Sequence, residues 1–522
     1  MRPSTTKLGI CGVRLKTDSK KTLLNAVSVS LMTFGLTACA VTPEAINDAE
    51  LLNRVETNLA DMYEDQEPVS GPMDLYEADA RGLKYNLDKR LKMMERSLEE
   101  ARLARTHADF LPQIAVKAGY RRRDNFAASS SLNLQTGLQN FGNSTSSDKK
   151  LRTADLQMVW NVLDFGLTYL RAKNEADRVL IAEERRIKVA QNLILDIRDS
   201  FWRALGSQRL LPQVNKLIRD INTTIGRSKN LISGGTGEPQ KELQSQRELL
   251  NHLSDLMEVR RRLSLATTEL AALINIPPGE QLRLIIRKSS DMSVPGLRAR
   301  YSDIEIAALL NRPELREEDY KRRITETDLR AAYVRLLPGL ELRYGPNYDS
   351  NSFLLHDNWS NVGVAVTKNL MEIATAPRAI KFAETDRDVA TARQMALSMA
   401  VVAQVHISLQ RFALSKDILR VSTRLLSIDR KLSGIADESS EASDGSELDA
   451  LSARSREIVS ELRYYAAFAD VQNSFGRIIN SVGSHRLPEE FEDMDVRSLA
   501  RELRSVLDEW SPPFGEMTVA QN

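Results

Sequence analysis

Cysteine, aromatic residues and net charge are all scarce in this chain of 522 residues. The two cysteines, Cys11 and Cys39, both lie near the N-terminus, so no structural disulfide is expected. Only 6% of the residues are aromatic, and a net charge of +1 predicts no basic surface for nucleic acid. With 27% charged residues beside alanine and leucine, the composition is typical of long packed helices.

Catalytic and metal-binding patterns are missing as well. The five histidines are scattered, and none has a metal-binding spacing such as His-Glu-x-x-His. Asp164-Phe165-Gly166 spells a kinase tripeptide, but no His-Arg-Asp loop accompanies it, and Asp164 is better interpreted as a helix N-cap. The Gly-rich stretch 234–237 joins two helices and does not end in Gly-Lys-Ser/Thr. We therefore expect neither an enzyme nor a cofactor.

The N-terminus has the pattern of a secretion signal. Lys20 and Lys21 precede an apolar run, Leu23 to Leu36, of about 14 residues, which suits a signal sequence and is too short to cross a bilayer as a helix. The run ends in Leu36-Thr37-Ala38-Cys39, which resembles a bacterial lipobox. Cys39 would then be the acylated first residue of the mature chain. A plain signal peptide with a cysteine at its cleavage site is the alternative.

A tandem duplication organises most of the remaining chain. A helix expected over about 75–109 runs into Leu111-Pro112, and a similar Ala-rich helix runs into Leu337-Pro338 about 226 residues later. An alternating strand follows each proline. Upstream, the residues of 77–90 are echoed by those of 305–316 at nearly the same offset. The sequence therefore predicts a helix-strand-strand-helix unit that occurs twice.

The predicted strands have one apolar face and are about 9–11 residues long, the length that a tilted membrane strand needs. In the first unit one strand covers 113–123, a Ser/Asn/Gly-rich loop follows at 124–150, and the second strand contains the alternation at 156–162. The second unit alternates more cleanly: Leu340, Leu342 and Tyr344 face one way, Glu341 and Arg343 face the other way, and Val362, Val364 and Val366 line the return strand.

Very long helices follow the strands. From Leu167 to Ile232 only Gly206 and Pro212 interrupt the pattern, and a continuous helix of about 66 residues would be on the order of 100 Å long. A second long helix is expected to open near Pro377. Heptad seams indicate that both pack as coiled coils. The seams are Ile187, Ala190, Ile194, Ile197, Phe201 and Ala204 in the first helix and Leu414, Ile418, Val421, Leu425, Ile428 and Leu432 in the second.

Four amphipathic strands raise a closure problem if they lie in lipid. A membrane-spanning sheet must close into a barrel, because an open edge leaves backbone groups unpaired at a cost of several kcal/mol each. Four strands cannot enclose a lumen, so several copies must contribute strands to one barrel. The alternative is a soluble helical protein in which the four strands form a small sheet.

The order of these motifs resembles the TolC-like outer-membrane efflux proteins, in their lipoprotein-bearing branch. The resemblance covers about 74–485 and depends on the duplicated order of its motifs. These are the opening over 75–90, Ala108 to Pro112 with its strand, Trp160 to Gly166, Arg312-Pro313-Glu314-Leu315, and Leu336-Leu337-Pro338.

The resemblance implies a mainly α protein with a membrane β part. Three copies would form one twelve-stranded outer-membrane β-barrel, continued by a long periplasmic α-helical barrel. The homotrimer would dock a periplasmic adaptor protein and an inner-membrane pump or ABC exporter. It would serve as the passive conduit of a tripartite efflux or type I secretion system. A lipid-anchored periplasmic helical scaffold without a pore is the alternative function.

The expected functional residues lie at three places. Cys39 is the lipidation site, and Asp164 and Gly166 form the strand-to-helix turn, whose second-unit counterpart at about 370–373 lacks both Asp and Gly. An acidic turn after the second long helix is expected to form a ring at the periplasmic entrance, made of Asp437, Glu438, Glu441, Asp444 and Asp449. The alternative is a flexible, solvated loop with no gating role, which its Ser and Gly content also suggests.

The expected domain organisation follows from the same motifs. It consists of a signal peptide (1–38), an N-terminal tether (39–72), the first structural repeat (73–278), an inter-repeat linker (279–300), the second structural repeat (301–485) and a C-terminal tail (486–522).

Overall fold

The computed structural model describes residues 43–234, 239–287, 293–297, 300–441, 447–483 and 493–508. The chain divides into two compact units, Met1–Glu64 and Asp65–Asn522. The described part of the first unit contains helix α2 (Asp48–Asp61), which begins with a capping box between Asn47 and Glu50. Cys39 lies outside the described residues.

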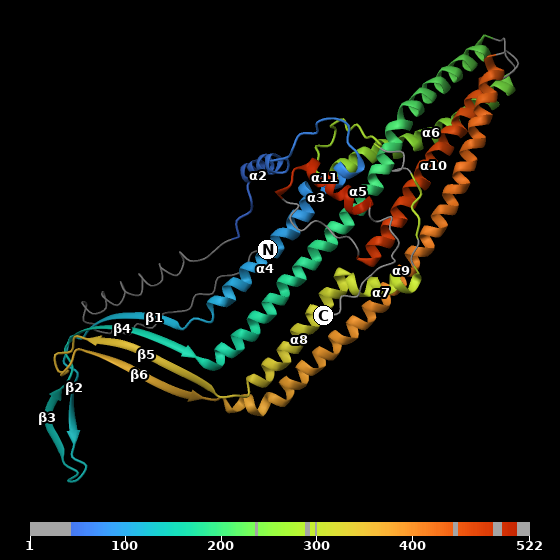
Figure 1. Cartoon of the computed structure of the whole chain (residues 1–522). Helices are drawn as coiled ribbons and strands as arrows, with labels where there is room; N and C mark the ends of the chain where they lie inside the picture. Colours follow the sequence, from blue (N-terminus) through green and yellow to red (C-terminus); the bar gives the residue numbers. More distant parts are fainter. Residues whose placement is uncertain are drawn as a thin grey trace, which may run out of the picture. The chain divides into compact units, whose positions relative to one another are not determined.

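The second unit contains two equivalent sets of elements, as the duplication predicts (Figure 1). The first set is α3 (Leu75–Tyr85), α4 (Leu87–Ala108), β1 (Gln113–Arg122), β4 (Lys150–Asn161), α5 (Val162–Ser233) and α6 (Pro239–Leu273). The second set is α7 (Tyr301–Asn311), α8 (Pro313–Val334), β5 (Gly339–Asp349), β6 (Asn358–Thr367), α9 (Leu370–Glu441) and α10 (Glu447–Val482). Helix α11 (Val496–Asp508) follows them.

The first expected helix is in fact two helices, because the backbone of Asn86 is extended between α3 and α4. The Asn86 side chain accepts a hydrogen bond from the Lys89 N–H at 3.1 Å and donates one to the Leu273 carbonyl at 2.9 Å. It therefore caps α4 and ties the break to the end of α6. In the second set, Pro313 at the start of α8 marks the equivalent break.

The segment predicted as a loop at 124–150 contains a second sheet instead. Strands β2 (Ala128–Leu132) and β3 (Gln139–Thr145) pair as an antiparallel hairpin with one register shift. Asn133 closes the turn, since its side-chain oxygen accepts hydrogen bonds from the N–H groups of Gln135 and Thr136. The Ser/Asn/Gly-rich composition concealed the strands because it is equally typical of loops.

The main sheet has the order β1-β4-β5-β6, and all its neighbours are antiparallel. The helices that directly precede or follow these four strands lie in the same order as the strands: α4 packs on α5, α5 on α8 and α8 on α9 (Figure 1). Further from the sheet, α5 packs on α6 and α10, and α10 packs on α9. The layer of four strands therefore continues as a layer of four helices. One edge of this helical layer is α4 near the sheet and α6 further away, and the other edge is α9 throughout.

The two long helices, α5 and α9, each have 72 residues. The predicted seam of α5 is largely buried inside the chain, as Ile194, Ile197 and Phe201 show. Pro377 does not open α9 as expected; it lies inside the helix, which begins seven residues earlier at Leu370. Asn369 replaces it as the start signal, because its side chain accepts a hydrogen bond from the Met371 N–H at 3.0 Å.

Candidate functional site

The main sheet separates its apolar and polar side chains by face. In the register, Leu342 lies opposite Trp160 on one side and Val364 on the other. Residues directly opposite one another share a face, so these three side chains point the same way. The opposite face presents Arg343 and Glu341, whose side chains form an ion pair at 2.5 Å. The alternation predicted from the sequence is thus present across neighbouring strands.

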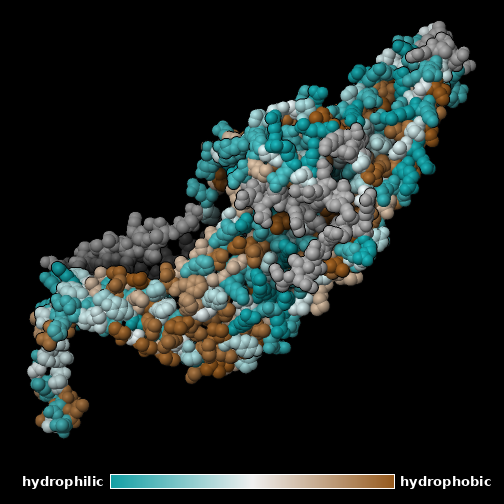
Figure 2. Space-filling model, in the orientation of Figure 1, coloured by the Kyte–Doolittle hydropathy of each residue, from teal (hydrophilic) through white to brown (hydrophobic). Residues whose placement is uncertain are grey.

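The apolar face of the sheet is exposed in the single chain. Val362, Val364 and Val366 are 80%, 67% and 68% exposed. Figure 2 shows a broad hydrophobic area over the sheet and the adjoining helix ends. Monomeric soluble proteins rarely expose apolar patches of this kind, whereas lipid solvates them. The strands have 10 to 12 residues each, close to the length that a tilted membrane strand needs.

Both outer edges of the main sheet are open. Within the described residues, β1 pairs only with β4 and β6 pairs only with β5. Inside lipid the free backbone groups on these edges need partners, since no water reaches them. The sheet is therefore one part of a larger closed structure if it spans a membrane.

The two junctions between strand and long helix are built in the same way. Asn161 ends β4, and its side-chain oxygen accepts hydrogen bonds from the N–H groups of Leu163 and Asp164. Asn369 caps α9 equivalently. The prediction that Asp164 is the cap is wrong, because Asp164 lies in the first turn of α5. Gly166 is not required for space, since a Cβ there would meet no atom within 4 Å.

Aromatic side chains mark the first of these junctions. Phe165 makes edge-to-face contacts with Phe110, at 5.2 Å between ring centroids, and with Trp160, at 6.0 Å. Phe165 and Trp160 are 43% and 36% exposed. Aromatic residues with a polar tip suit the boundary between a membrane and water, and Trp160 lies where such a boundary is expected.

The ends of the long helices bring charged residues together far from the sheet. Asp437 in α9 pairs with Arg454 in α10 at 2.9 Å, and Arg227 in α5 pairs with Glu447 at 2.9 Å. The predicted acidic turn is mostly helical, because α9 continues to Glu441 and α10 begins at Glu447. Glu447 and Asp449 lie in the first turn of α10, where acidic side chains stabilise a helix through its dipole. These acids therefore favour a helix at positions where the sequence suggested a turn.

The remaining residues of the expected ring have different environments. Glu438 and Asp449 are exposed. Glu441 is the last residue of α9, and Asp444 lies outside the described residues. Among the described residues, no group of three or more His, Cys, Asp or Glu side chains is placed to hold a metal ion.

The predicted seam of α9 is exposed, although the equivalent seam of α5 is buried. Leu414 and Val421 are 61% and 66% exposed, whereas α9 buries a second stripe that includes Val405 and Phe412. The intramolecular contact with α10 therefore uses a different face of α9 from the one predicted. One helix of the described part, α9, is also long and apolar enough to cross a membrane by length and composition.

The opposite edge of the helical layer also carries an exposed apolar stripe. On α6, Leu243, Leu250 and Met257 recur every seven residues and are 57%, 51% and 49% exposed. We call these three residues the α6 stripe, and the exposed residues of the predicted α9 seam the α9 stripe. Heptad stripes at both edges are what a coiled coil between copies of a chain requires.

A buried ion pair joins α3 to α5. Asp79 is fully buried, and its carboxylate accepts a hydrogen bond from Arg198 at 2.9 Å. Among the described residues, its other oxygen has no hydrogen-bond partner. Burial raises the pKa of Asp79 to about 6, and the charge of Asp74 adds to the shift, while Arg198 opposes it.

We expect Asp79 to destabilise the protein as the pH rises. Because its pKa is higher in the folded chain than the ordinary 3.8, its contribution is most favourable below pH 4 and is lost as the pH passes about 6. The shift corresponds to about 3 kcal/mol. Denaturant unfolding at pH 4.5 and 7 gives the difference in the free energy of unfolding, wild type minus Asp79→Asn, and this difference should fall at the higher pH because the asparagine side chain does not titrate. A difference that does not change with pH would contradict the assignment.

Comparisons with known proteins agree with this geometry. Residues 87–275 match the model of a family described as outer membrane efflux protein. No curated protein matches the chain. Several solved structures do.

The chain is similar to the CmeC outer membrane channel of Campylobacter jejuni, with 13% identity, a TM-score of 0.60, and coverage of 90% of this chain and 98% of that one. It is also similar to the open-state MtrE outer membrane channel of Neisseria gonorrhoeae, with 14% identity, a TM-score of 0.60, and coverage of 78% and 88%. The outer membrane protein VceC of Vibrio cholerae is similar as well, with 12% identity, a TM-score of 0.58, and coverage of 78% of this chain and 96% of that one. These likenesses confirm the predicted fold.

Proposed function

We propose that this chain is a member of the outer membrane efflux protein family, whose model matches residues 87–275, and that it is the outer-membrane channel of a tripartite efflux or type I secretion system. It would act as a passive conduit across the periplasm and the outer membrane. The observation that carries the proposal is the main sheet, with one exposed apolar face and two open edges, continuous with helices of 72 residues. Helices of that length reach on the order of 100 Å.

Copies of the chain would complete the barrel by joining opposite edges. The β6 edge of one copy meets the β1 edge of the next, and the exposed α9 stripe meets the α6 stripe of the next. Such head-to-tail contacts produce a closed ring when the rotation closes. Three copies would supply twelve strands, in agreement with the trimer that the resemblance implies.

The ring would place the two ends of the molecule in different compartments. The sheet would lie in the outer membrane, and the paired helix ends around Arg227, Asp437 and Glu447 would lie deep in the periplasm. That end would be the docking site for a periplasmic adaptor and, through it, an inner-membrane pump or ABC exporter.

Electrical recording separates the conduit from a lipid-anchored scaffold without a pore. Purified full-length protein inserted in a planar bilayer should give stepwise conductance of uniform size, since each inserted ring provides one pore. A scaffold would bind the bilayer without conducting. Uniform absence of current from inserted protein would reject the conduit.

We propose that Cys39 is acylated and anchors the mature chain to the inner leaflet of the outer membrane, as the Leu-Thr-Ala-Cys sequence suggests. Cys39→Ser should abolish labelling with a radioactive fatty acid. Part of the export activity should survive, because one acyl chain gives only marginal membrane binding and the barrel remains inserted. Equal labelling of the mutant and the wild type would refute the anchor.

We further propose that the exposed acids at the far helix ends form a ring at the periplasmic entrance. Asp437 and Glu447 are paired with arginines, so, of the acids whose side chains the structure describes, Glu438 and Asp449 would carry most of the charge. A ring of carboxylates attracts cations and repels anions. Glu438→Gln with Asp449→Asn should lower the cation selectivity in a planar bilayer, whereas Arg420→Ala, an exposed change elsewhere on α9, should not. Selectivity that stays the same after neutralisation would reject the ring.

A further inference from the structure

A cavity of about 610 Å³ lies inside the second unit, between α11 and the start of the first repeat. Its walls come from residues 70–77, from Ile285 and Arg287, and from α11 with the residue before it. All three parts belong to one chain, so the cavity does not depend on the proposed ring.

Arginines dominate this cavity. Arg497, Arg501 and Arg504 line it from successive turns of α11, and Arg287 lines it from the segment after α6. The carboxylates of the wall are those of Asp74, Glu77 and Asp495. Arginine is suited to phosphates and carboxylates because its planar guanidinium offers parallel N–H donors.

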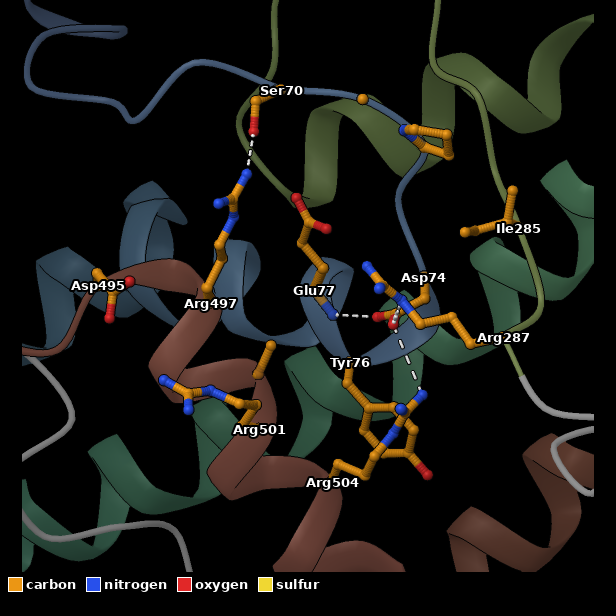
Figure 3. Close-up of a pocket in the computed structure, with 13 residues that line it drawn as sticks. Ser70, Asp74, Tyr76, Glu77, Ile285, Arg287, Asp495, Arg497, Arg501 and Arg504 are labelled. Atoms are coloured by element: carbon orange, nitrogen blue, oxygen red, sulfur yellow. Dashed lines mark hydrogen bonds and ion pairs between the residues drawn. The ribbon is translucent and has the colours of Figure 1, made fainter.

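The carboxylates are shared unevenly among these arginines. Asp74 pairs with Arg287 and lies 3.6 Å from Arg504, and Glu77 lies 3.6 Å from Arg81, which is outside the cavity wall. Figure 3 shows Arg497 reaching toward Ser70 on one side and Arg287 and Arg504 gathered around Asp74 on the other, with Glu77 between them.

Two guanidinium groups are left with neutral partners. Arg497 donates a hydrogen bond to the Ser70 hydroxyl at 2.8 Å, and Arg501 donates one to the Ser498 hydroxyl at 3.0 Å. Among the described residues, no carboxylate lies within ion-pair distance of either group. Asp495 interacts electrostatically with Arg501, so the wall holds four arginines against three carboxylates, and an anion that enters the cavity balances the excess positive charge.

The attachment of α11 does not require these arginines. Val496, Leu499 and Leu503 are at most 1% exposed and pack against Tyr76, Ala80 and Leu83 of α3. Glu67 adds a polar link, because its carboxylate accepts hydrogen bonds from the Val496 N–H and from the Lys84 ammonium group. The apolar face therefore holds α11 in place, and the arginine face is available for a ligand.

We propose that this cavity binds a small polar anion that carries a carboxylate or phosphate group and at least one hydroxyl or ammonium donor. The oxyanion contacts Arg497 and Arg501, and the donor contacts the Glu77 carboxylate between the two sides of the cavity. Such a ligand links α11 to the start of the first repeat. The chemical class of the ligand follows from these contacts, because Arg497 and Arg501 require an oxyanion and the Glu77 carboxylate requires a hydrogen-bond donor. A carboxylate and a phosphate both satisfy the first requirement.

Calorimetric titration of the purified full-length protein in detergent tests the proposal. Two pairs of probes distinguish a carboxylate from a phosphate ligand and test the need for a hydroxyl group. The first pair is citrate and tricarballylate, which lacks the hydroxyl group, and the second is glycerol 3-phosphate and inorganic phosphate. Sodium chloride at equal ionic strength controls for screening. We expect saturable binding of citrate or glycerol 3-phosphate, and weaker binding of the partner probe without a hydroxyl group.

Substitutions locate the binding in the cavity. Arg497→Ala with Arg501→Ala should weaken binding at least tenfold, while Arg497→Lys with Arg501→Lys should weaken it less because the charge remains. The matched control is Arg387→Ala with Arg420→Ala, which removes two exposed arginines that pair with aspartates of α9. Absence of saturable binding by the wild type, or an affinity that the alanine pair leaves unchanged, would overturn the proposal.

Discussion

Replacing Val364 with arginine is expected to prevent assembly of the barrel. Val364 is 67% exposed on the apolar face of β6 and lies opposite Leu342 of β5. An arginine on the lipid side near the middle of a membrane strand costs about 2–4 kcal/mol. Each of three copies in the ring would bear this cost, so the total is about 6–12 kcal/mol, which is comparable to the whole free energy of unfolding of a typical protein. Heat-stable oligomers on gels of outer-membrane fractions should disappear.

Arg343→Ala is the matched change on the opposite face. Arg343 lies on the polar face, where it pairs with Glu341, so its loss should leave the oligomer intact. The two substitutions lie one strand apart at nearly the same level, since Arg343 is opposite Gly363. Equal tolerance of both would mean that the sheet does not face lipid.

The second large effect is expected from Val421→Asp. Val421 is 66% exposed in the middle of the α9 stripe, although the heptad pattern marks it as a contact position. If the stripe packs on α6 of the next copy, an unpaired carboxylate buried there costs on the order of 3–5 kcal/mol for each interface. Size-exclusion chromatography with light scattering should then report monomers for the variant, whereas the proposed ring predicts trimers for the wild type.

Ser427→Asp controls for the added charge. Ser427 is also exposed on α9, but it lies outside the stripe, and its hydroxyl bonds to the Arg424 carbonyl of the same helix. The same carboxylate at this position remains in water, so the trimer should persist. Dissociation by both variants would indicate a general weakness of α9, and dissociation by neither would mean that the stripe is not an interface.

Much of the fold could be predicted because the chain repeats itself. Leu111-Pro112 and Leu337-Pro338 mark the ends of equivalent helices, and the structure places a strand after each. The period-two alternation around Leu342 predicted the apolar face, and the register confirms that its neighbours share it. Periodicity predicts the two faces of this sheet well because all four strands present mainly apolar residues to one face and mainly polar or small residues to the other.

The details that failed are those that depend on single polar side chains. Asn161 and Asn369 cap the long helices, whereas the sequence pointed to Asp164 and Pro377. Asparagine is a good N-cap, and its occurrence immediately before the first residue of each long helix was the signal that could have been used. Asn86 similarly divides a helix that its apolar pattern suggested was continuous.

The α9 seam shows a limit of heptad analysis. The pattern identified contact positions on both long helices, but it could not say whether the partner belongs to the same chain. Ile197 of α5 is completely buried, whereas Ile418 of α9 is 48% exposed. Only the arrangement of the other helices reveals which stripe is left for another copy.

Disulfide cross-linking between the free edges of the sheet tests the closed ring most directly. In a Cys39→Ser background, cysteine at Ala118 of β1 would be combined in turn with cysteine at Ser360, Val362 or Val364 of β6, all on the apolar face. The internal control is cysteine at Leu342 and Val364, which are opposite within one chain. The account predicts that at least one β1–β6 pair yields covalent dimers and trimers, while the control links only within monomers. Monomers from every β1–β6 pair, beside an efficient control disulfide, would contradict the closed ring.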